Sequence, residues 1–267
     1  MKNKKTLLLL IPIIIVAMIL LVILFVPPPK EPFFQFAKVS NTNYANGDNV
    51  QVYFISWYGC PYGSTESWSL YLALSQYGTL NVTPTYSDVE LVPLAQGQTV
   101  IGTVPGLIFT SFSPRSVVYF HAIYLLGRIY QNDSASLPNG TIISLSKILN
   151  IELQELKKEV PAWVYNLIYE YQLQLPYQDN EPFAKLGNPP HIATTIIITG
   201  PHGTWMMIGY DRQVYYGSPG TLVMFARQNP YAPLLLLKMV EYHDIPPSLG
   251  FINDEAIQIN KIILKAL

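Results

Sequence analysis

The order of apolar and polar positions along the chain predicts a long apolar segment followed by a domain of alternating strands and helices. Residues 50–56 form a run of mostly β-branched and aromatic side chains, which is typical of a buried strand. Residues 64–77 then carry apolar side chains at helical spacing. Comparable patterns predict strands at 33–39, within 80–92, within 104–130, at 192–199 and at 204–210, and helices at 144–175, after Ser218, at 233–243 and at 254–267. Pro161 is expected to divide the helical stretch 144–175 into two helices.

The first 32 residues predict a membrane anchor with a spacer behind it. Thr6 to Val26 is a run of 21 uncharged, almost wholly apolar residues. As a helix it would extend about 32 Å, enough to cross a hydrocarbon core of roughly 30 Å. Lysines in residues 1–5 favour a cytoplasmic tail and place the domain, 33–267, outside the cell. The proline-rich stretch 27–32 is expected to be a stiff linker. A cleaved signal peptide is the alternative, although the apolar run is longer than usual for one.

Composition narrows the classes of function. Half of the residues are hydrophobic and only 12% are charged, with 16 basic and 17 acidic side chains. This balance gives no excess of basic residues with which to bind nucleic acid, so nucleic-acid binding is not expected. A single cysteine excludes an internal disulfide and any multi-cysteine metal site. No phosphate-binding loop or zinc-protease motif occurs, and His121, His202 and His243 lack metal-ligand spacing, so we expect neither a cofactor nor a metal.

The only cysteine lies at the corner between the predicted strand 50–56 and the helix that follows it. Cys60 comes just before the expected helix start, where backbone N–H groups and the helix dipole stabilise a thiolate. Gly63 or Ser64 is the expected cap, and Glu66 in the first turn would suit the positive end of the dipole. The sequence therefore singles out Cys60 as a candidate nucleophile.

The residues of this corner carry a resemblance. The run Trp57-Tyr-Gly-Cys-Pro-Tyr-Gly63, between a strand and a helix, resembles the active-site corner of the thioredoxin superfamily, whose motif is Trp-Cys-x-x-Cys or Cys-Pro-Tyr-Cys. The first cysteine of that motif maps onto Cys60 and the second onto Gly63, so the usual intramolecular disulfide cannot form. The longer run from Ser56 to Trp68 resembles a membrane-anchored family of unknown function from thermoacidophilic archaea, placed among thioredoxin-like folds. That resemblance extends over nearly the whole chain and brings no established activity.

The resemblance implies a fold and a second part of the site. It implies an α/β domain with a thioredoxin-like sheet, flanking helices and a helical insertion at about 144–175. It also implies a proline, often cis, just before a strand that enters a hairpin and then a final helix. Pro189-Pro190 before 192–199 fits this pattern, so Pro190 is the candidate cis-proline and is expected beside Cys60.

Each candidate residue has a chemical and a structural interpretation. Cys60 could form mixed disulfides with a protein, peptide or small-thiol partner, or it could be a buried, inert thiol. His191 could act as a base or thiolate partner, or as a hydrogen-bonded structural group. The candidate binding residues around the cysteine could form a rim for an apolar peptide or simply pack the corner; they are Trp57, Tyr58, Pro61, Tyr62 and Gly63.

Asparagine sequons provide candidate modification sites on an exported domain. Asn81, Asn132 and Asn139 each begin an Asn-x-Ser/Thr triplet, so glycans are expected there if the domain is outside the cell.

Three functions are compatible with these observations. The first is a tethered binding or chaperone-like module, favoured by the missing second cysteine. The second is a monothiol oxidoreductase or isomerase that uses Cys60. The third is an accessory subunit of a membrane complex, which rests only on the anchor and on long apolar segments.

Overall fold

The computed structural model describes residues 31–130, 133–215 and 217–267. The chain forms two units, Met1–Glu31 and Pro32–Leu267. The expected tail, the expected anchor Thr6 to Val26 and most of the expected linker lie outside the described residues. Within the described ranges, no helix has the length and apolar character needed to cross a bilayer.

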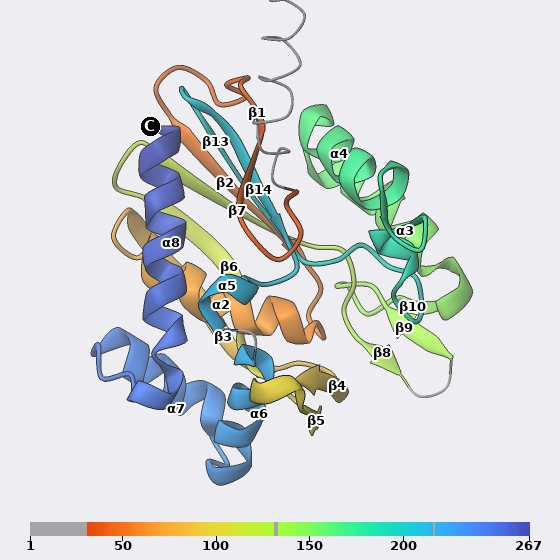
Figure 1. Cartoon of the computed structure of the whole chain (residues 1–267), viewed down its shortest axis with the longest axis vertical. Coiled ribbons are helices and arrows are strands. Elements are labelled where there is room, and N and C mark those ends of the chain that lie inside the picture. Colours follow the sequence, from red (N-terminus) through yellow and green to blue (C-terminus); the bar gives the residue numbers. More distant parts are fainter. Residues whose placement is uncertain (1–30, 131–132, 216) are drawn as a thin grey trace, which may run out of the picture. The chain divides into compact units, whose positions relative to one another are not determined.

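A mixed five-stranded sheet lies at the centre of the second unit (Figure 1). Its strands, in spatial order, are β1 (Ala37–Ser40), β14 (Gly203–Ile208), β13 (Thr195–Gly200), β2 (Val50–Ser56) and β7 (Val118–Tyr124). β2 and β7 run parallel, and every other neighbouring pair is antiparallel. The predicted α/β class is confirmed at this level.

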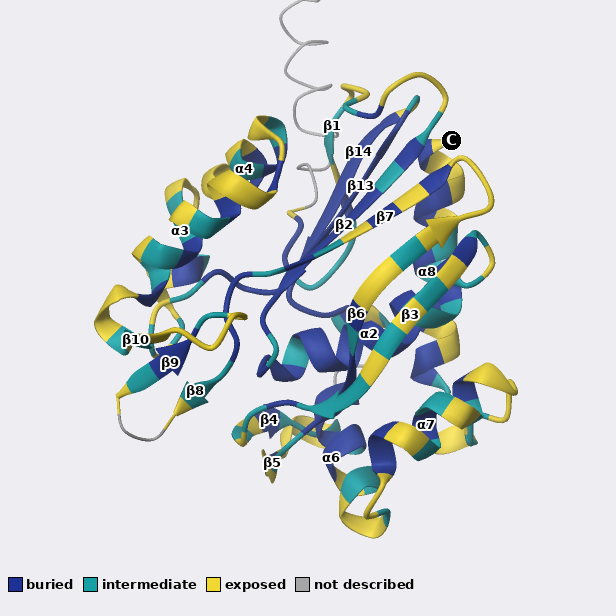
Figure 2. Ribbon diagram, turned by 180° about the vertical axis from the view of Figure 1, so that it is seen from behind, coloured by how far each residue is buried: buried dark blue, intermediate teal, exposed yellow. Residues whose placement is uncertain are grey.

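Helices cover both faces of the sheet, which explains why its central strands are continuously apolar. Val52 and Phe54 of β2 pack in one hydrophobic cluster with two helices, whereas Tyr53 and Ile55 pack in another with two different helices. This alternation is the period of two expected of a strand. The first face carries α2 (Pro61–Leu74) and α8 (Phe251–Ala266), and the second carries α3 (Ile148–Glu159) and α4 (Ala162–Tyr169). Figure 2 shows β13 and β14 as almost wholly buried.

Smaller elements surround this core. β3 (Gly78–Tyr86) and β6 (Pro105–Pro114) form an antiparallel pair, and β4 (Glu90–Pro93) and β5 (Thr99–Gly102), which lie between them in the chain, form a hairpin. A three-stranded sheet contains β8 (Ile129–Tyr130), β9 (Ser134–Ser136) and β10 (Ile142–Ser144), and a short pair contains β11 (Pro176–Gln178) and β12 (Glu181–Pro182). The remaining α-helices of the described chain are α5 (Arg212–Tyr215), α6 (Ser218–Gln228) and α7 (Ala232–Glu241), and a π-helical turn occupies Glu170–Gln174.

Most predicted elements are present, although several begin at other residues than predicted; the starts of α2 and β1 have clear local reasons. β2 has the predicted bounds, and α3 and α4 are divided near Pro161 as expected. Helix α2 begins at Pro61, earlier than predicted, because Cys60 is the N-cap and proline suits the first helical position. β1 begins at Ala37, because Phe33 forms only an isolated bridge with Ile208.

Candidate functional site

Cys60 lies where the end of β2 turns into α2, and its sulfur caps that helix. The backbone N–H of Gly63 donates to Cys60 Sγ at 3.3 Å, which satisfies one of the free amides of the first helical turn. Thr194 Oγ1, which comes just before β13, lies 3.1 Å from the same sulfur. The cysteine side chain is thus held by two elements that are far apart in the sequence, and only 3% of it is exposed.

Burial decides the protonation of this thiol. Loss of hydration raises the pKa of Cys60 to about 11, although the hydrogen bonds from Thr194 and Gly63 act in the opposite direction. At neutral pH the group is therefore a thiol, with a thiolate fraction of about one in ten thousand. The expected stabilisation at a helix N-terminus is present but smaller than the cost of burying a charge.

The position that would hold a second cysteine has no room for a side chain. A Cβ at Gly63 would lie 2.0 Å from Ser56 Oγ and 3.2 Å from Thr194 Oγ1. These two hydroxyls hydrogen bond to each other at 2.9 Å and are buried. The glycine is therefore required by the packing of the end of β2 and the start of β13 against α2.

The expected proline is not the neighbour of Cys60. The cis peptide bond joins Asn188 to Pro189, so the choice of Pro190 as the cis-proline is wrong. Pro190 lines a separate cavity with Leu149 and Asn150. Thr194 takes the place next to the sulfur because β13 begins at Thr195, later than predicted, and the residue that precedes this strand faces the start of α2.

Cys60 opens into a cavity of about 270 Å3. Four of the candidate residues from the sequence line it with Cys60, namely Trp57, Pro61, Tyr62 and His191. Three others do not: Pro190 and Tyr58 line different cavities, and Gly63 donates its N–H to the sulfur. The Tyr58 ring packs 4.9 Å from that of Tyr124. The wall also includes residues that sequence reasoning missed, namely Phe34, Glu90, Ile129, Phe183, Leu186, Asn188 and Thr194.

Two polar side chains of the cavity wall have defined hydrogen-bonding states. His191 Nδ1 lies 2.7 Å from the carbonyl oxygen of Pro189 and must carry the proton that it donates. Burial lowers the pKa of His191, so the ring is neutral and its Nε2 is an acceptor. The indole Nε1 of Trp57 is buried and has no hydrogen-bond partner among the described residues. The cavity is therefore lined by apolar surface and a neutral imidazole, whereas the Trp57 N–H is itself closed off by burial.

Phe34 forms a strained part of the wall. Its φ is +56°, which is rare for a bulky residue and costs on the order of 1–3 kcal/mol. The conformation is held by hydrogen bonds of Phe34 N to Ile208 O and of Arg212 N to Phe34 O, and the Arg212 guanidinium lies 3.4 Å from the ring centroid. Gly209 must be glycine here, because its φ is +90° and a Cβ would lie 2.6 Å from the Phe34 ring.

Glu90 is the acidic residue of the cavity. It is partly buried, and loss of hydration, together with the nearby charge of Asp88, raises its pKa to about 7. A single acidic residue between Val89 and Leu91 gives no sequence signal of a site. It reaches the cavity only because the β4–β5 hairpin folds beside the Cys60 corner, a long-range arrangement that local patterns do not encode.

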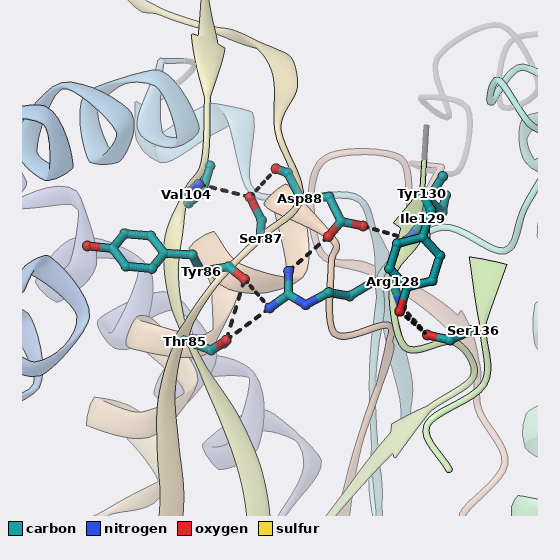
Figure 3. Close-up of polar contacts among 9 residues, drawn as sticks. All are labelled: Thr85, Tyr86, Ser87, Asp88, Val104, Arg128, Ile129, Tyr130 and Ser136. Carbon is teal, nitrogen blue, oxygen red and sulfur yellow. Dashed lines mark hydrogen bonds and ion pairs between the residues drawn. The ribbon is translucent and has the colours of Figure 1, made fainter. Parts of the chain in front are cut away.

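An ion pair fixes this hairpin to the corner and to the small sheet β8–β9–β10. Figure 3 shows the Arg128 guanidinium extending between Asp88 and the end of β3. Arg128 Nη1 donates to Asp88 Oδ1 at 2.8 Å, Nη2 donates to the Tyr86 carbonyl at 2.8 Å, and Ile129 N donates to Asp88 Oδ2 at 2.8 Å. The Asp88 backbone N–H donates to Gly59 O, and a Cβ at Gly59 would lie 2.1 Å from Asp88 Oδ2.

Replacing Asp88 should loosen this wall of the cavity. We expect Asp88→Ala to lower the free energy of unfolding by about 1–2 kcal/mol, because the Arg128 pair is lost and the Ile129 amide loses its acceptor. Asp88→Asn keeps an acceptor for that amide and should lose about half as much. Urea denaturation measures both variants, and an unchanged midpoint for Asp88→Ala would refute the structural role.

Glu66 lies beyond the first turn of α2, which begins at Pro61, so it does not meet the positive end of the dipole as expected. It is fully buried and meets Glu255 of α8, and the Asp211 backbone N–H donates to Oε1 of both carboxyl groups, at 3.3 and 3.2 Å. Burial, followed by the proximity of Glu255, raises the pKa of Glu66 well above its usual range, and burial raises that of Glu255 to about 7. The two carboxyl groups therefore favour the protonated form, and they link α2 to α8.

The two candidate glycosylation sites that the structure describes are both exposed. Asn81 is exposed in β3, and its amide donates to Ser111 Oγ at 2.7 Å. Asn139 is exposed in a turn, and its side-chain oxygen accepts from Thr141 N. Asn132 lies outside the described residues. Both described sequons therefore remain candidates.

The fold and the site define an α/β protein whose only cysteine caps a helix at the end of a central strand and faces a partly apolar cavity. In the described part of the chain, no group of three or more His, Cys, Asp or Glu side chains is arranged to hold a metal. The sequence matches a family model described as "Domain of unknown function (DUF929)" over residues 35–265, and the chain belongs to this family. No curated protein and no solved structure matches the sequence significantly.

Proposed function

We propose that this chain is a membrane-tethered, extracytoplasmic binding module with a thioredoxin-like domain, which holds an apolar segment of a polypeptide in the Cys60 cavity. The tether and its orientation rest on the sequence of residues 1–32. The thioredoxin-like assignment is supported by the order of elements: a central strand, a cysteine corner and a helix, then a parallel strand, and finally a hairpin that precedes the last helix. Thr194 beside the sulfur, and the additional elements β3–β6 and α5–α7, depart from that pattern.

The observation that favours binding over redox catalysis is the state of Cys60. A thiol–disulfide exchange step needs a thiolate that can reach the sulfur of a partner. Here the thiol is 3% exposed, its pKa is raised to about 11, and no side chain fits at position 63 to resolve a mixed disulfide. What remains is a cavity with aromatic walls and a neutral imidazole, which are the features of a ligand site.

Reaction with glutathione disulfide tests this proposal. If Cys60 exchanged, its thiolate would attack one sulfur, glutathione thiolate would leave, and the chain would gain one glutathionyl group. We expect the folded full-length protein at neutral pH to gain no such group in the time in which a urea-unfolded sample is fully modified, because of the small thiolate fraction and the burial of the sulfur. Intact-protein mass spectrometry measures the adduct, and Cys60→Ser is the blank.

The alternative is a monothiol oxidoreductase. The capping hydrogen bond from Gly63 N to Cys60 Sγ favours it, since that bond stabilises a thiolate. Rapid formation of the mixed disulfide by the folded chain, with an apparent pKa well below 8.5, would establish this alternative and remove the non-redox interpretation.

A further inference from the structure

The Cys60 cavity continues into a larger groove. Glu90, Ile129 and Asn188 line both the cavity of about 270 Å3 and an adjoining open groove of about 1030 Å3. Asp88 and Arg128 also line this groove, and their ion pair neutralises both charges there. Glu90 therefore lies at the junction of a small apolar cavity and a wide groove.

Two edge strands and exposed apolar side chains border the groove and the cavity. β4 belongs to a two-stranded hairpin, and β8 is the outer strand of the order β10–β9–β8. Four apolar side chains of the cavity and groove are strongly exposed: Val89 (65%), Leu91 (64%), Leu186 (44%) and Tyr130 (42%). The Ile129 N–H of β8 is taken by Asp88, so an extended polypeptide would pair with the backbone of β4, while the flanking apolar side chains contact its own.

Glu90 forms no ion pair with a basic side chain in the described part of the protein. The ion pairs found there join Arg128 with Asp88, Lys158 with Glu155 and Lys185 with Glu181. The Glu90 carboxyl also accepts no hydrogen bond from any described residue. It is nevertheless partly buried and lines the cavity with Trp57, Tyr62 and Ile129. A partly desolvated carboxylate without a partner is unfavourable, and a cation supplied by a ligand would offset that cost.

We propose that Glu90 is a cation-binding subsite that makes this site selective for extended polypeptide segments with a basic side chain beside an apolar one. The apolar side chain enters the Cys60 cavity, the ammonium or guanidinium group pairs with Glu90, and the backbone lies along the groove between β4 and β8. In the described part of the chain, no group of three or more His, Cys, Asp or Glu side chains is arranged to hold a metal, whereas a carboxylate suits an organic cation. This inference rests on the proposed function and adds the charge of the ligand to it.

A matched pair of peptides tests this selectivity on the full-length chain in non-ionic detergent. The probes are acetyl-Ala-Leu-Phe-Lys-Leu-Ala-amide and the same peptide with glutamine in place of lysine, each titrated by isothermal titration calorimetry. We expect the lysine peptide to bind at least about tenfold more tightly at roughly pH 8, where Glu90 is ionised, and this preference to shrink at roughly pH 5. In Glu90→Gln the preference should fall to about twofold or less, whereas Glu159→Gln, on the exposed end of α3, should keep it.

Each other outcome has a defined meaning. Equal binding of both peptides by the wild type, or an unchanged preference in Glu90→Gln, overturns the cation subsite and leaves the binding module intact. Binding of neither peptide overturns the proposed function together with this inference. If n-butylamine displaces the lysine peptide at the same concentration as the peptide, a small amine is the ligand, and the proposal that the ligand is a polypeptide is overturned.

Discussion

The free energy of unfolding should fall by at least about 3 kcal/mol between roughly pH 4 and roughly pH 8, because the buried pair Glu66–Glu255 is protonated in the folded chain and Glu255 alone contributes this amount. The pKa of Glu255 is raised to about 7 in the folded chain, whereas a glutamate in the unfolded chain titrates near 4.3. Between these two values the folded state binds more protons than the unfolded state, so stability decreases as the pH rises. The stabilisation is complete below the unfolded pKa and is lost as the pH passes the folded pKa.

Other buried acids change stability in the same direction. Glu152 of α3 is fully buried, accepts from Ile192 N at 2.7 Å, and has its pKa raised by burial. This hydrogen bond holds α3 against the segment that leads into β13, and burial favours the protonated form of the carboxyl. Its titration should therefore make the decrease with pH steeper.

Guanidinium denaturation at a series of pH values measures this dependence. Glu66→Gln combined with Glu255→Gln keeps the shape and the hydrogen-bonding capacity of the pair but removes both titrations, so the pH profile should become much flatter. Glu159→Gln removes an exposed carboxyl of the same type and should leave the profile unchanged. A double variant that retains the full wild-type slope would show that the pair is not the source.

Restoring the second cysteine of the thioredoxin motif should destabilise the protein rather than create a redox pair. In Gly63→Cys the new Cβ would lie 2.0 Å from Ser56 Oγ, so the hydroxyl must leave Thr194 or the start of α2 must shift. Overpacking of this kind costs about 1–3 kcal/mol, and the lost buried hydrogen bond adds about 1 kcal/mol. We expect a total loss of about 2–4 kcal/mol and no disulfide with Cys60.

A double-mutant cycle isolates the clash. Ser56→Ala removes the oxygen nearest to the new Cβ, so Gly63→Cys in this background should lose clearly less stability than in the wild type. Ser56 Cβ remains 3.1 Å away, so the recovery is expected to be partial. Denaturation midpoints and intact mass measure the two effects. A Gly63→Cys protein of wild-type stability that loses two hydrogens on oxidation would contradict the steric argument.

The sequence predicts those parts of the fold that depend on local pattern. The run 50–56 has both of its faces buried, and the resulting β-branched and aromatic stretch marks β2 with its observed bounds. The break at Pro161 and the turn at 200–203 are likewise local signals, and both are present. The hairpin β4–β5 was missed because its four-residue strands have exposed apolar positions and lack a clean alternation.

The site was predictable where it depends on the corner and not where it depends on distant segments. Cys60, Trp57, Pro61 and Tyr62 are adjacent in sequence, so their shared position follows from one turn. The part of the site next to the Cys60 sulfur depends on the residue at which β13 begins. The strand starts three residues later than the apolar run suggested, so Thr194, rather than the chosen Pro190, meets the sulfur. Glu66 was misassigned because its partner Glu255 lies 189 residues further along the chain.

The entry of the chain into the folded unit also has a mechanical consequence. Pro32 O accepts from Ile208 N, and Phe34 N donates to Ile208 O, so the first residues of the unit lie along the end of β14. Phe34, in its strained conformation, is at the same time a wall of the cavity that holds Cys60. Tension applied to the chain from its N-terminal side would therefore act on the hydrogen bonds that join Pro32 and Phe34 to Ile208, and so on one wall of the Cys60 cavity.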